Sequence, residues 1–273
     1  YGFTPEEYEA LKPGDDAMHL LHLDQPILEI NVTPDRGYAF SYRGIAREFH
    51  NSTGAEFTDP VGELNAHVPQ IEEQAADTTH DIDVIIDDEN PIHGVVGCDR
   101  FYTRAVHGYD ATSKTPNWMR RRLTRAGMRS LTLPVDVTNY VMLDLGQPMH
   151  AYDLDKIEGP IVVRRARAGE TLTTLDGKDH DLDPEDLLIT DSPNGEQGSR
   201  ILGIAGVMGG EYGEVTSETT NILLEAAHFD PISVARSSRR HKIPSEAARR
   251  FERGVDDQIQ PAAAQMACDL LEA

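Results

Sequence analysis

The stretch from Val135 to Asp153, VDVTNYVMLDLGQPMHAYD, limits the fold of this chain more than any other. Its first half carries apolar residues at helical spacing, which predicts a helix with one buried stripe. Gly146 is typical of a residue that ends a helix, and the proline two positions later prevents the helix from resuming. Thr138 and Asn139 should therefore lie on the helix, and His150 on a fixed turn beyond it. Two rigid segments with polar side chains favour a pocket, although a core helix beside an ordinary surface histidine fits the same residues.

Length and composition bound the class of protein. The chain has 273 residues, enough for two modest domains with their own cores. No apolar run approaches the length of a membrane-spanning helix, so we expect no membrane partner. Cys98 and Cys268 lie far apart, which is typical of a cytoplasmic protein and excludes a cysteine-rich zinc module. His19 and His22 form an HxxH pair without the Glu and the further ligand of a zinc hydrolase, so we expect no metal site.

The charge distribution is uneven. A net charge of −22 argues against nucleic acid as a partner, because phosphates repel an acidic surface, and we expect no DNA partner. No Lys or Arg occurs between Pro60 and Asp99, whereas arginines cluster at Arg120–Arg122 and between Arg236 and Arg253. The arginine-dotted second part could still hold an RNA end locally. A solubility or salt-adaptation trait would explain the overall acidity equally well.

The first part of the chain predicts a small helical module over residues 1–57. A capping box at Thr4 starts a helix, residues 27–32 alternate as a strand, and Tyr38 to Thr53 form a helix that offers Phe49 to a core. Residues 58–80 have weak periodicity and predict a linker. The chain starts without an initiator Met and stops within an apparent helix, so we expect a piece of a longer chain.

The second domain is expected over residues 81–273, with helices first, a strand-rich centre and helices last. The fold class is therefore α+β. Helices are expected at residues 115–126, 135–145, 231–241 and 245–253. Strands are expected at residues 82–86, 100–106, 161–165, 171–175, 187–190, 201–207 and 222–226.

Several strings occur together in one order: Glu29 to Gly37 (EINVTPDRG), Arg43 to Glu48 (RGIARE), Val135 to Val141 (VDVTNYV), Gly146 to His150 (GQPMH), Gly206 to Glu211 (GVMGGE), Leu223 to Glu225 (LLE) and Arg250 to Asp256 (RFERGVD). This combination resembles the bacterial phenylalanyl-tRNA synthetase β subunit. The resemblance covers nearly the whole chain, from the end of the N-terminal helical, B1-like module through the B3/B4 editing domain. The regions of the family before Tyr1 and beyond Ala273 are absent from this sequence.

The resemblance implies a function. In that family the B3/B4 domain hydrolyses tyrosine misattached to phenylalanine tRNA, while aminoacylation takes place on the α subunit of an α2β2 heterotetramer. The partners implied are therefore phenylalanine tRNA and the α subunit. The resemblance implies no cofactor in this part of the protein, whereas ATP and Mg²⁺ serve the whole phenylalanine–tRNA ligase. A non-catalytic scaffold that orients tRNA and subunits is the alternative from another class.

Editing requires a group that distinguishes tyrosine from phenylalanine. An apolar pocket rejects an added hydroxyl only by about a hundredfold, whereas a pocket that hydrogen-bonds the hydroxyl discriminates by roughly 10⁴. Glu225 suits this task because it is an ionisable residue in an otherwise apolar predicted strand. A solvent-facing position on an edge strand would explain Glu225 as well.

The other candidate site residues follow the resemblance. His150 would position water or the terminal ribose, since a neutral imidazole both donates and accepts. Thr138 and Asn139 match positions that line the family's pocket, and Arg129 aligns with the editing region. Gly209 would let a ligand approach the backbone. A structural histidine, a surface arginine and an ordinary glycine turn are the alternatives.

One segment departs from the family. Where the family commonly has His-Thr-Asp-Ala-Ser, this chain has Pro244 to Ala248, PSEAA. Ser245 keeps a hydroxyl and Ala247 keeps a small pocket wall, whereas Pro244 replaces the histidine. No nucleophile–base triad is evident, so the mechanism expected is hydrolysis by a positioned water, which an activated ester permits.

Overall fold

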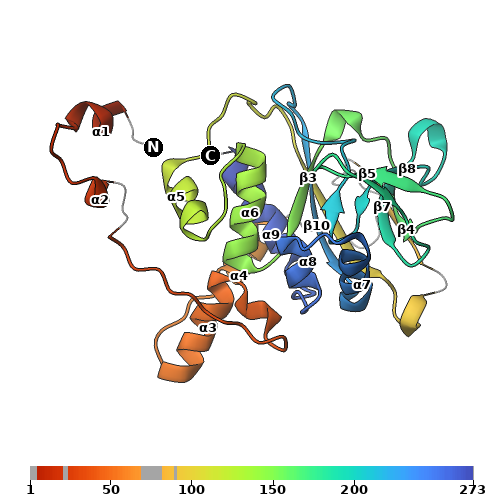
Figure 1. Ribbon diagram of the computed structural model, residues 1–273, viewed down its shortest axis with the longest axis horizontal. Helices are drawn as coiled ribbons and strands as arrows, with labels where there is room; N and C mark the ends of the chain where they lie inside the picture. The colour runs from red at the N-terminus through yellow and green to blue at the C-terminus, as the bar shows by residue number, and fades with distance from the viewer. Residues whose placement is uncertain (1–4, 21–23, 69–81, 89–90, 273) are drawn as a thin grey trace.

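A three-stranded antiparallel sheet lies at the centre of the computed structural model, which describes residues 5–20, 24–68, 82–88 and 91–272. Strand β10 (Ile222–Phe229) is its middle strand, between β2 (Cys98–Val106) and β3 (Met149–Asp153). All eight residues of β10 are buried or nearly so, because both faces of the strand are covered. Figure 1 shows helices on one side of β3 and β10 and further strands on the other.

The helical layer consists of α5 (Asn117–Arg125), α6 (Leu133–Leu145) and α9 (Gln260–Glu272). Helix α6 confirms the predicted helix, and Gly146 ends it in the left-handed conformation, with φ of 89°. Apolar side chains of the three helices pack on one face of the three-stranded sheet; they include Met119, Leu123, Val137, Val141, Ala263 and Ala267. This face of the sheet is therefore an apolar helix–sheet interface.

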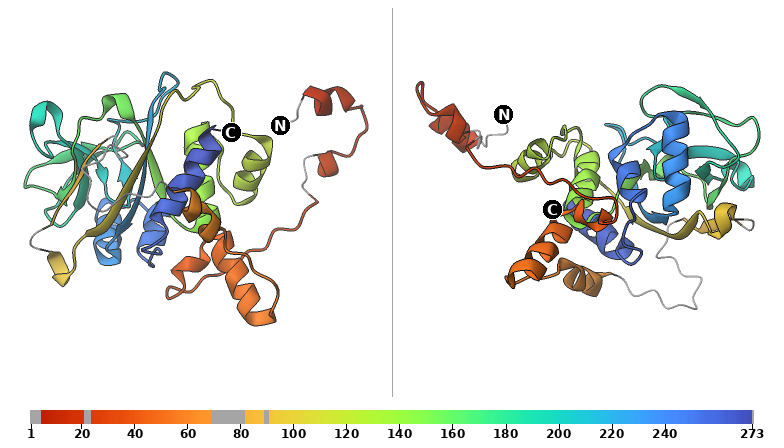
Figure 2. Two further views of the ribbon diagram at one scale, coloured as in Figure 1. Left: turned by 180° about the vertical axis from the view of Figure 1, so that it is seen from behind. Right: turned by 60° about the horizontal axis from the view of Figure 1, so that its bottom comes forward.

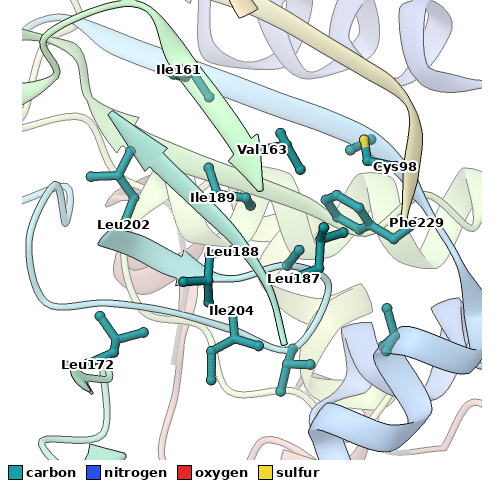
Figure 3. Close-up of a cluster of buried hydrophobic side chains, with 14 of the residues drawn as sticks. Cys98, Ile161, Val163, Leu172, Leu187, Leu188, Ile189, Leu202, Ile204 and Phe229 are labelled. Carbon is teal, nitrogen blue, oxygen red and sulfur yellow. The ribbon is translucent and has the colours of Figure 1, made fainter. Parts of the chain in front are cut away.

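The other face packs on a five-stranded sheet in the order β1 (Val84–Asp87), β4 (Ile161–Arg165), β7 (Leu187–Asp191), β8 (Arg200–Ile204) and β9 (Met208–Gly209). Only the β1–β4 pairing is parallel. Figure 3 shows the cluster between the sheets, where Leu187, Ile189 and Phe229 come together. The short hairpin of β5 (Thr171–Thr173) and β6 (Asp179–Asp181), with α7 (Pro231–His241) and α8 (Glu246–Phe251), completes this half.

The described N-terminal part is helical, with α1 (Pro5–Ala10), α2 (Ala17–Leu20), α3 (Tyr42–Thr53) and α4 (Pro60–His67). Figures 1 and 2 show α3 and α4 beside the lower ends of α6 and α9, and α1 and α2 farther away. Arg253 donates to the carbonyl of Val32 at 2.9 Å, and Arg250 to the carbonyl of Phe40 at 3.3 Å. The N-terminal segment is therefore attached to α8 and to the residues that follow it. Short 3₁₀ turns cover Gly37–Ala39, Ile92–Gly94, Leu154–Lys156 and Pro193–Gly195.

The α+β class is confirmed, with four local corrections. Residues 27–32 form no strand, because no described strand pairs with them, and Leu28 is 84% exposed. Phe49 is 60% exposed and belongs to no core. The predicted linker contains α4, whose Val61 and Leu64 pack on the helical cluster, while residues 69–81 lie outside the described part. The predicted strand 201–207 ends at Ile204, where a turn leads into β9.

The remaining predicted elements are confirmed with small shifts of their ends. Among the described residues, no helix is long and apolar enough to cross a membrane.

Candidate functional site

A cavity of about 270 Å³ lies where α6, β3, the β8–β9 turn, β10 and the start of α8 meet. Seven of the eight predicted site residues line it: Thr138, Asn139, His150, Gly209, Glu225, Ser245 and Ala247. Its other walls are mainly apolar, from Met142, Met149, Ile189, Ile204, Val207, Met208, Phe229 and Phe251. The volume is near the lower end of the roughly 300–1,000 Å³ typical of ligand pockets, which suits a single amino-acid side chain.

The link from α6 to β3 is held in place by hydrogen bonds of buried side-chain amides. The side-chain amide of Gln147 donates to the carbonyl of Ala227 at 3.0 Å and to that of Pro148 at 2.7 Å. Gln260 donates to the side-chain oxygen of Gln147 at 2.9 Å. His150 therefore follows a fixed link, but it lies on strand β3 and not on a turn as the sequence predicted. A strand fixes it more firmly, because β10 pairs with β3 residue by residue.

The strand register places Glu225 directly opposite His150. Tyr152, two positions farther along β3, donates its hydroxyl to Oε2 of Glu225 at 2.6 Å. The rings of His150 and Tyr152 meet edge to face, with centroids 4.5 Å apart. Glu225 is only 6% exposed and lies on the central strand, so a solvent-facing position on an edge strand is excluded.

Burial sets the protonation of this trio. It raises the pKa of the Glu225 carboxyl from 4.5 to about 7, although the hydrogen bond from Tyr152 lowers it. Burial also lowers the pKa of the His150 imidazole from 6.5 to about 4, so this ring is neutral at pH 7. The pKa of Tyr152 is raised well above 10 by burial and by the neighbouring Glu225 charge. Tyr152 is therefore a permanent donor, and Glu225 can ionise near neutral pH.

Gly209 forms a wall against His150. A Cβ built on Gly209 would lie 2.8 Å from Cε1 and 3.0 Å from Nε2 of His150. Real Cβ atoms essentially never approach so closely, so only glycine leaves the imidazole where it is. Gly209 therefore shapes the cavity because it has no side chain that would displace the His150 ring.

The remaining residues of the site lie on helices. Thr138 is nearly buried and donates its hydroxyl to the carbonyl of Val135 at 2.9 Å, while Asn139 is partly exposed. Ser245 caps α8 by accepting from the amide of Ala248 at 3.0 Å, so its oxygen is engaged while its proton is available. Ala247 is partly buried beside the same apolar cluster as Phe251. The Ser245 hydroxyl, which the sequence offered as a candidate site group, therefore also stabilises the start of α8.

Arg129 is the predicted residue that the structure does not bring to the cavity. It is exposed in the segment between α5 and α6 and does not line the cavity.

Tyr152 is the contact that sequence reasoning missed. Its signal was its position two residues after His150, which puts both side chains on one face of a strand. Within the described residues, no group of three His, Cys, Asp or Glu side chains could hold a metal ion.

Comparison with known proteins places this geometry in context. The family model of the B3/4 domain matches residues 97–273. The phenylalanine–tRNA ligase β subunit of Bifidobacterium longum is 73% identical over 271 residues, which are 99% of this chain and 31% of that protein. The corresponding subunit of Leifsonia xyli is 54% identical over 259 residues, which are 95% of this chain and 29% of that protein. The chain thus spans about a third of the length of these relatives.

A solved structure shows a weaker likeness. It is an N-terminal fragment of the phenylalanyl-tRNA synthetase β subunit from Pyrococcus horikoshii, 15% identical, with a TM-score of 0.39 over 76% of this chain and 59% of that chain.

Proposed function

The chain belongs to the B3/4 domain family, and from this membership we propose that it is the proofreading part of a phenylalanine–tRNA ligase β subunit. The resemblance to that subunit is confirmed by relatives of this name along nearly the whole chain. The proposed activity is hydrolysis of tyrosine misattached to phenylalanine tRNA. The observation that carries the proposal is a single buried carboxylate, Glu225, at the wall of a mainly apolar cavity.

Glu225 supplies the specificity in this proposal. Tyrosine and phenylalanine differ by one phenolic hydroxyl. A carboxylate accepts a charge-assisted hydrogen bond from that hydroxyl. Phenylalanine in the same cavity would leave the charged oxygen without a partner, which costs several kcal/mol in a buried site. Editing therefore removes the tyrosyl group and spares the correct product.

His150, Thr138 and Asn139 would serve the reacting end. The water oxygen attacks the ester carbonyl, the bond from the carbonyl carbon to the ribose oxygen breaks, and the ribose oxygen leaves with a proton that derives from the water. Neutral His150 can accept a hydrogen bond from the water, because a pKa of about 4 leaves one ring nitrogen free. The Asn139 amide can donate to the carbonyl oxygen as negative charge develops there.

The wider assignment follows the same proposal. Phenylalanine tRNA and the α subunit of an α2β2 ligase would be the partners, in the cytoplasm. Aminoacylation with ATP and Mg²⁺ would take place on the α subunit, outside this chain. Arg129, exposed between α5 and α6, would contact the tRNA outside the cavity.

Deacylation of Tyr-tRNA by the ligase that carries this chain tests the proposal. The variants Glu225→Ala and His150→Ala should each lower the rate, and Glu225→Ala should abolish the preference for Tyr-tRNA over Phe-tRNA. The variant Glu196→Ala, in the exposed loop after β7, is the matched control and should behave as wild type. If wild-type rates persist in both cavity variants, the proofreading proposal is wrong and the scaffold alternative takes its place.

A further inference from the structure

The two oxygens of Glu225 have different surroundings. Oε2 accepts the hydroxyl of Tyr152 at 2.6 Å. Oε1 has no hydrogen-bond partner among the described residues, and it is not completely enclosed by protein atoms. Since Glu225 lines the cavity, Oε1 is the oxygen that a ligand can reach. One oxygen is occupied by a phenol of the protein, and the other is available.

Tyr152 has little freedom to leave Oε2. It is 1% exposed and paired with Leu223 across the β3–β10 ladder. Its ring packs against His150 on one side. The hydroxyl therefore meets the carboxylate in one fixed geometry.

We propose that Tyr152 is a positioning residue for specificity: its hydroxyl holds Oε2 of Glu225, so that Oε1 faces the cavity and accepts the phenol of a bound tyrosyl group. One carboxylate is then shared by a phenol of the protein and a phenol of the substrate. This inference rests on the proposed function of the cavity.

Sharing the carboxylate in this way requires Glu225 to be ionised. A carboxylate accepts strongly at both oxygens, whereas a neutral carboxyl carries a proton on one of them, which makes that oxygen a donor and a poor acceptor. Two donors therefore bind the ionised form, and each favours it. The wild-type preference for tyrosine should weaken as the pH falls below about 7, where Glu225 becomes protonated.

Apart from Tyr152, no contacting group among the described residues favours the ionised form of Glu225. Among the described residues that line the cavity, none is Lys or Arg. The groups facing Glu225 are His150 and Tyr152 from β3 and Thr103 and the Cys98 thiol from β2, while Asp191 of β7 acts on Tyr152. The carboxylate of Glu246, from α8, lines the same cavity and is exposed. His150 is neutral, and the hydroxyl of Thr103 has no partner. Removal of the Tyr152 hydroxyl therefore removes the hydrogen bond that lowers the pKa of Glu225.

The test compares Tyr152→Phe with Tyr212→Phe in the ligase that carries this chain. Both variants keep the ring and lose a hydrogen-bonded hydroxyl; that of Tyr212 donates to the carbonyl of Lys156 at 3.0 Å, outside the cavity. At pH 7, Tyr152→Phe should lower kcat/KM for Tyr-tRNA deacylation by about tenfold, the effect of one hydrogen bond to a charged group. At pH 9 the loss should shrink, because Glu225 is then ionised in both proteins. Tyr212→Phe should follow the wild-type pH profile.

A second measurement separates this inference from the proposed function. Carbon-13 NMR of labelled glutamate carboxyls, with the Glu225 signal assigned by its loss in Glu225→Gln, follows the titration without any activity. The Glu225 midpoint should move to higher pH in Tyr152→Phe and stay in place in Tyr212→Phe. An unmoved midpoint together with an unchanged pH profile would overturn the role of Tyr152. A midpoint that moves in Tyr152→Phe, in a ligase whose wild type never deacylates Tyr-tRNA, would overturn the proofreading function alone.

Discussion

The two faces of strand β10 carry different kinds of side chain. Toward the helices, Ile222 and Leu224 are completely buried among apolar residues. Toward the five-stranded sheet, Leu223 and Ala227 belong to a second apolar cluster, but Glu225 stands between them. The first face stabilises the fold. The second gives up part of that stability to hold an ionisable group at a cavity.

The largest expected effect comes from removing the charge of Glu225, so that neither face of β10 carries a carboxylate. Glu225→Gln keeps the shape and an acceptor for Tyr152, but it cannot carry the charge. We expect loss of the tyrosine preference, by about a hundredfold or more. Deacylation of Tyr-tRNA and Phe-tRNA at pH 8 measures this ratio. An unchanged ratio would mean that the cavity does not use the charge of Glu225.

The same variant should be more stable than wild type at alkaline pH. The folded-state pKa of Glu225 is raised from 4.5 to about 7, so the folded state binds more protons between these values and stability falls as the pH rises through them. A shift of this size corresponds to about 3 kcal/mol above pH 7 and to nothing below pH 4. Urea denaturation of wild type and Glu225→Gln at pH 8 and pH 4 tests the sign, and an advantage of the variant at pH 4 alone would contradict it.

Leu224→Ala breaks the apolar face instead. Leu224 is completely buried, and truncation of such a leucine costs about 3 kcal/mol through lost burial and the cavity left behind. Urea denaturation should show this loss of stability. The ratio of Tyr-tRNA to Phe-tRNA deacylation by the folded protein should stay at its wild-type value, because Leu224 faces away from Glu225. A changed ratio with unchanged stability would contradict the division between the two faces.

Gly209→Ala sharpens the comparison on the cavity side. The new methyl group would meet the His150 ring at 2.8 Å, so the imidazole must move away from its place. We expect about a tenfold lower kcat for Tyr-tRNA deacylation. Thermal unfolding should also show a loss of about 1–3 kcal/mol, because the new methyl group overpacks the contact with the His150 ring. Gly62→Ala in α4, where nothing lies within 4 Å, is the matched control and should leave kcat alone.

Arg253→Ala has the smallest expected effect and lies outside both faces. It removes the hydrogen bond to the carbonyl of Val32 and the stacking over Phe40, with the guanidinium carbon 5.0 Å from the ring centroid. About 1 kcal/mol of stability should be lost, measured by urea denaturation. Tyrosine selectivity should be unchanged, and a loss of selectivity would show that the N-terminal segment contributes to the cavity. Arg239→Ala, which loses only an exposed ion pair with Glu252, should change stability by less.

Sequence reasoning succeeded where local rules and burial agree. The helix through Thr138 and its end at Gly146 follow from spacing and from a glycine signal, and the structure confirms both. Glu225 was identifiable because burying an ionisable residue in an apolar strand is costly unless the group has a partner or a function. The structure then removes the solvent-facing alternative, which only the position of β10 between two strands could decide.

Sequence reasoning failed where the outcome depends on distant partners. The contact between Tyr152 and Glu225 joins residues 73 positions apart, and a tyrosine in a strand is equally typical of an apolar core. Residues 27–32 alternate like a strand, but alternation does not supply a neighbouring strand. Helix α4 was missed because its propensity is weak and its stability comes from packing on α9.

The most direct test of the account is the binding of tyrosine and of phenylalanine by this chain, measured by calorimetry at pH 8 and at pH 5.5. The account predicts that tyrosine binds more tightly at pH 8, that this preference weakens at pH 5.5 as Glu225 becomes protonated, and that Glu225→Gln lacks it at both values. Equal binding of the two amino acids at pH 8, or a tyrosine preference that survives in Glu225→Gln, would contradict the claim that Glu225 recognises the phenol.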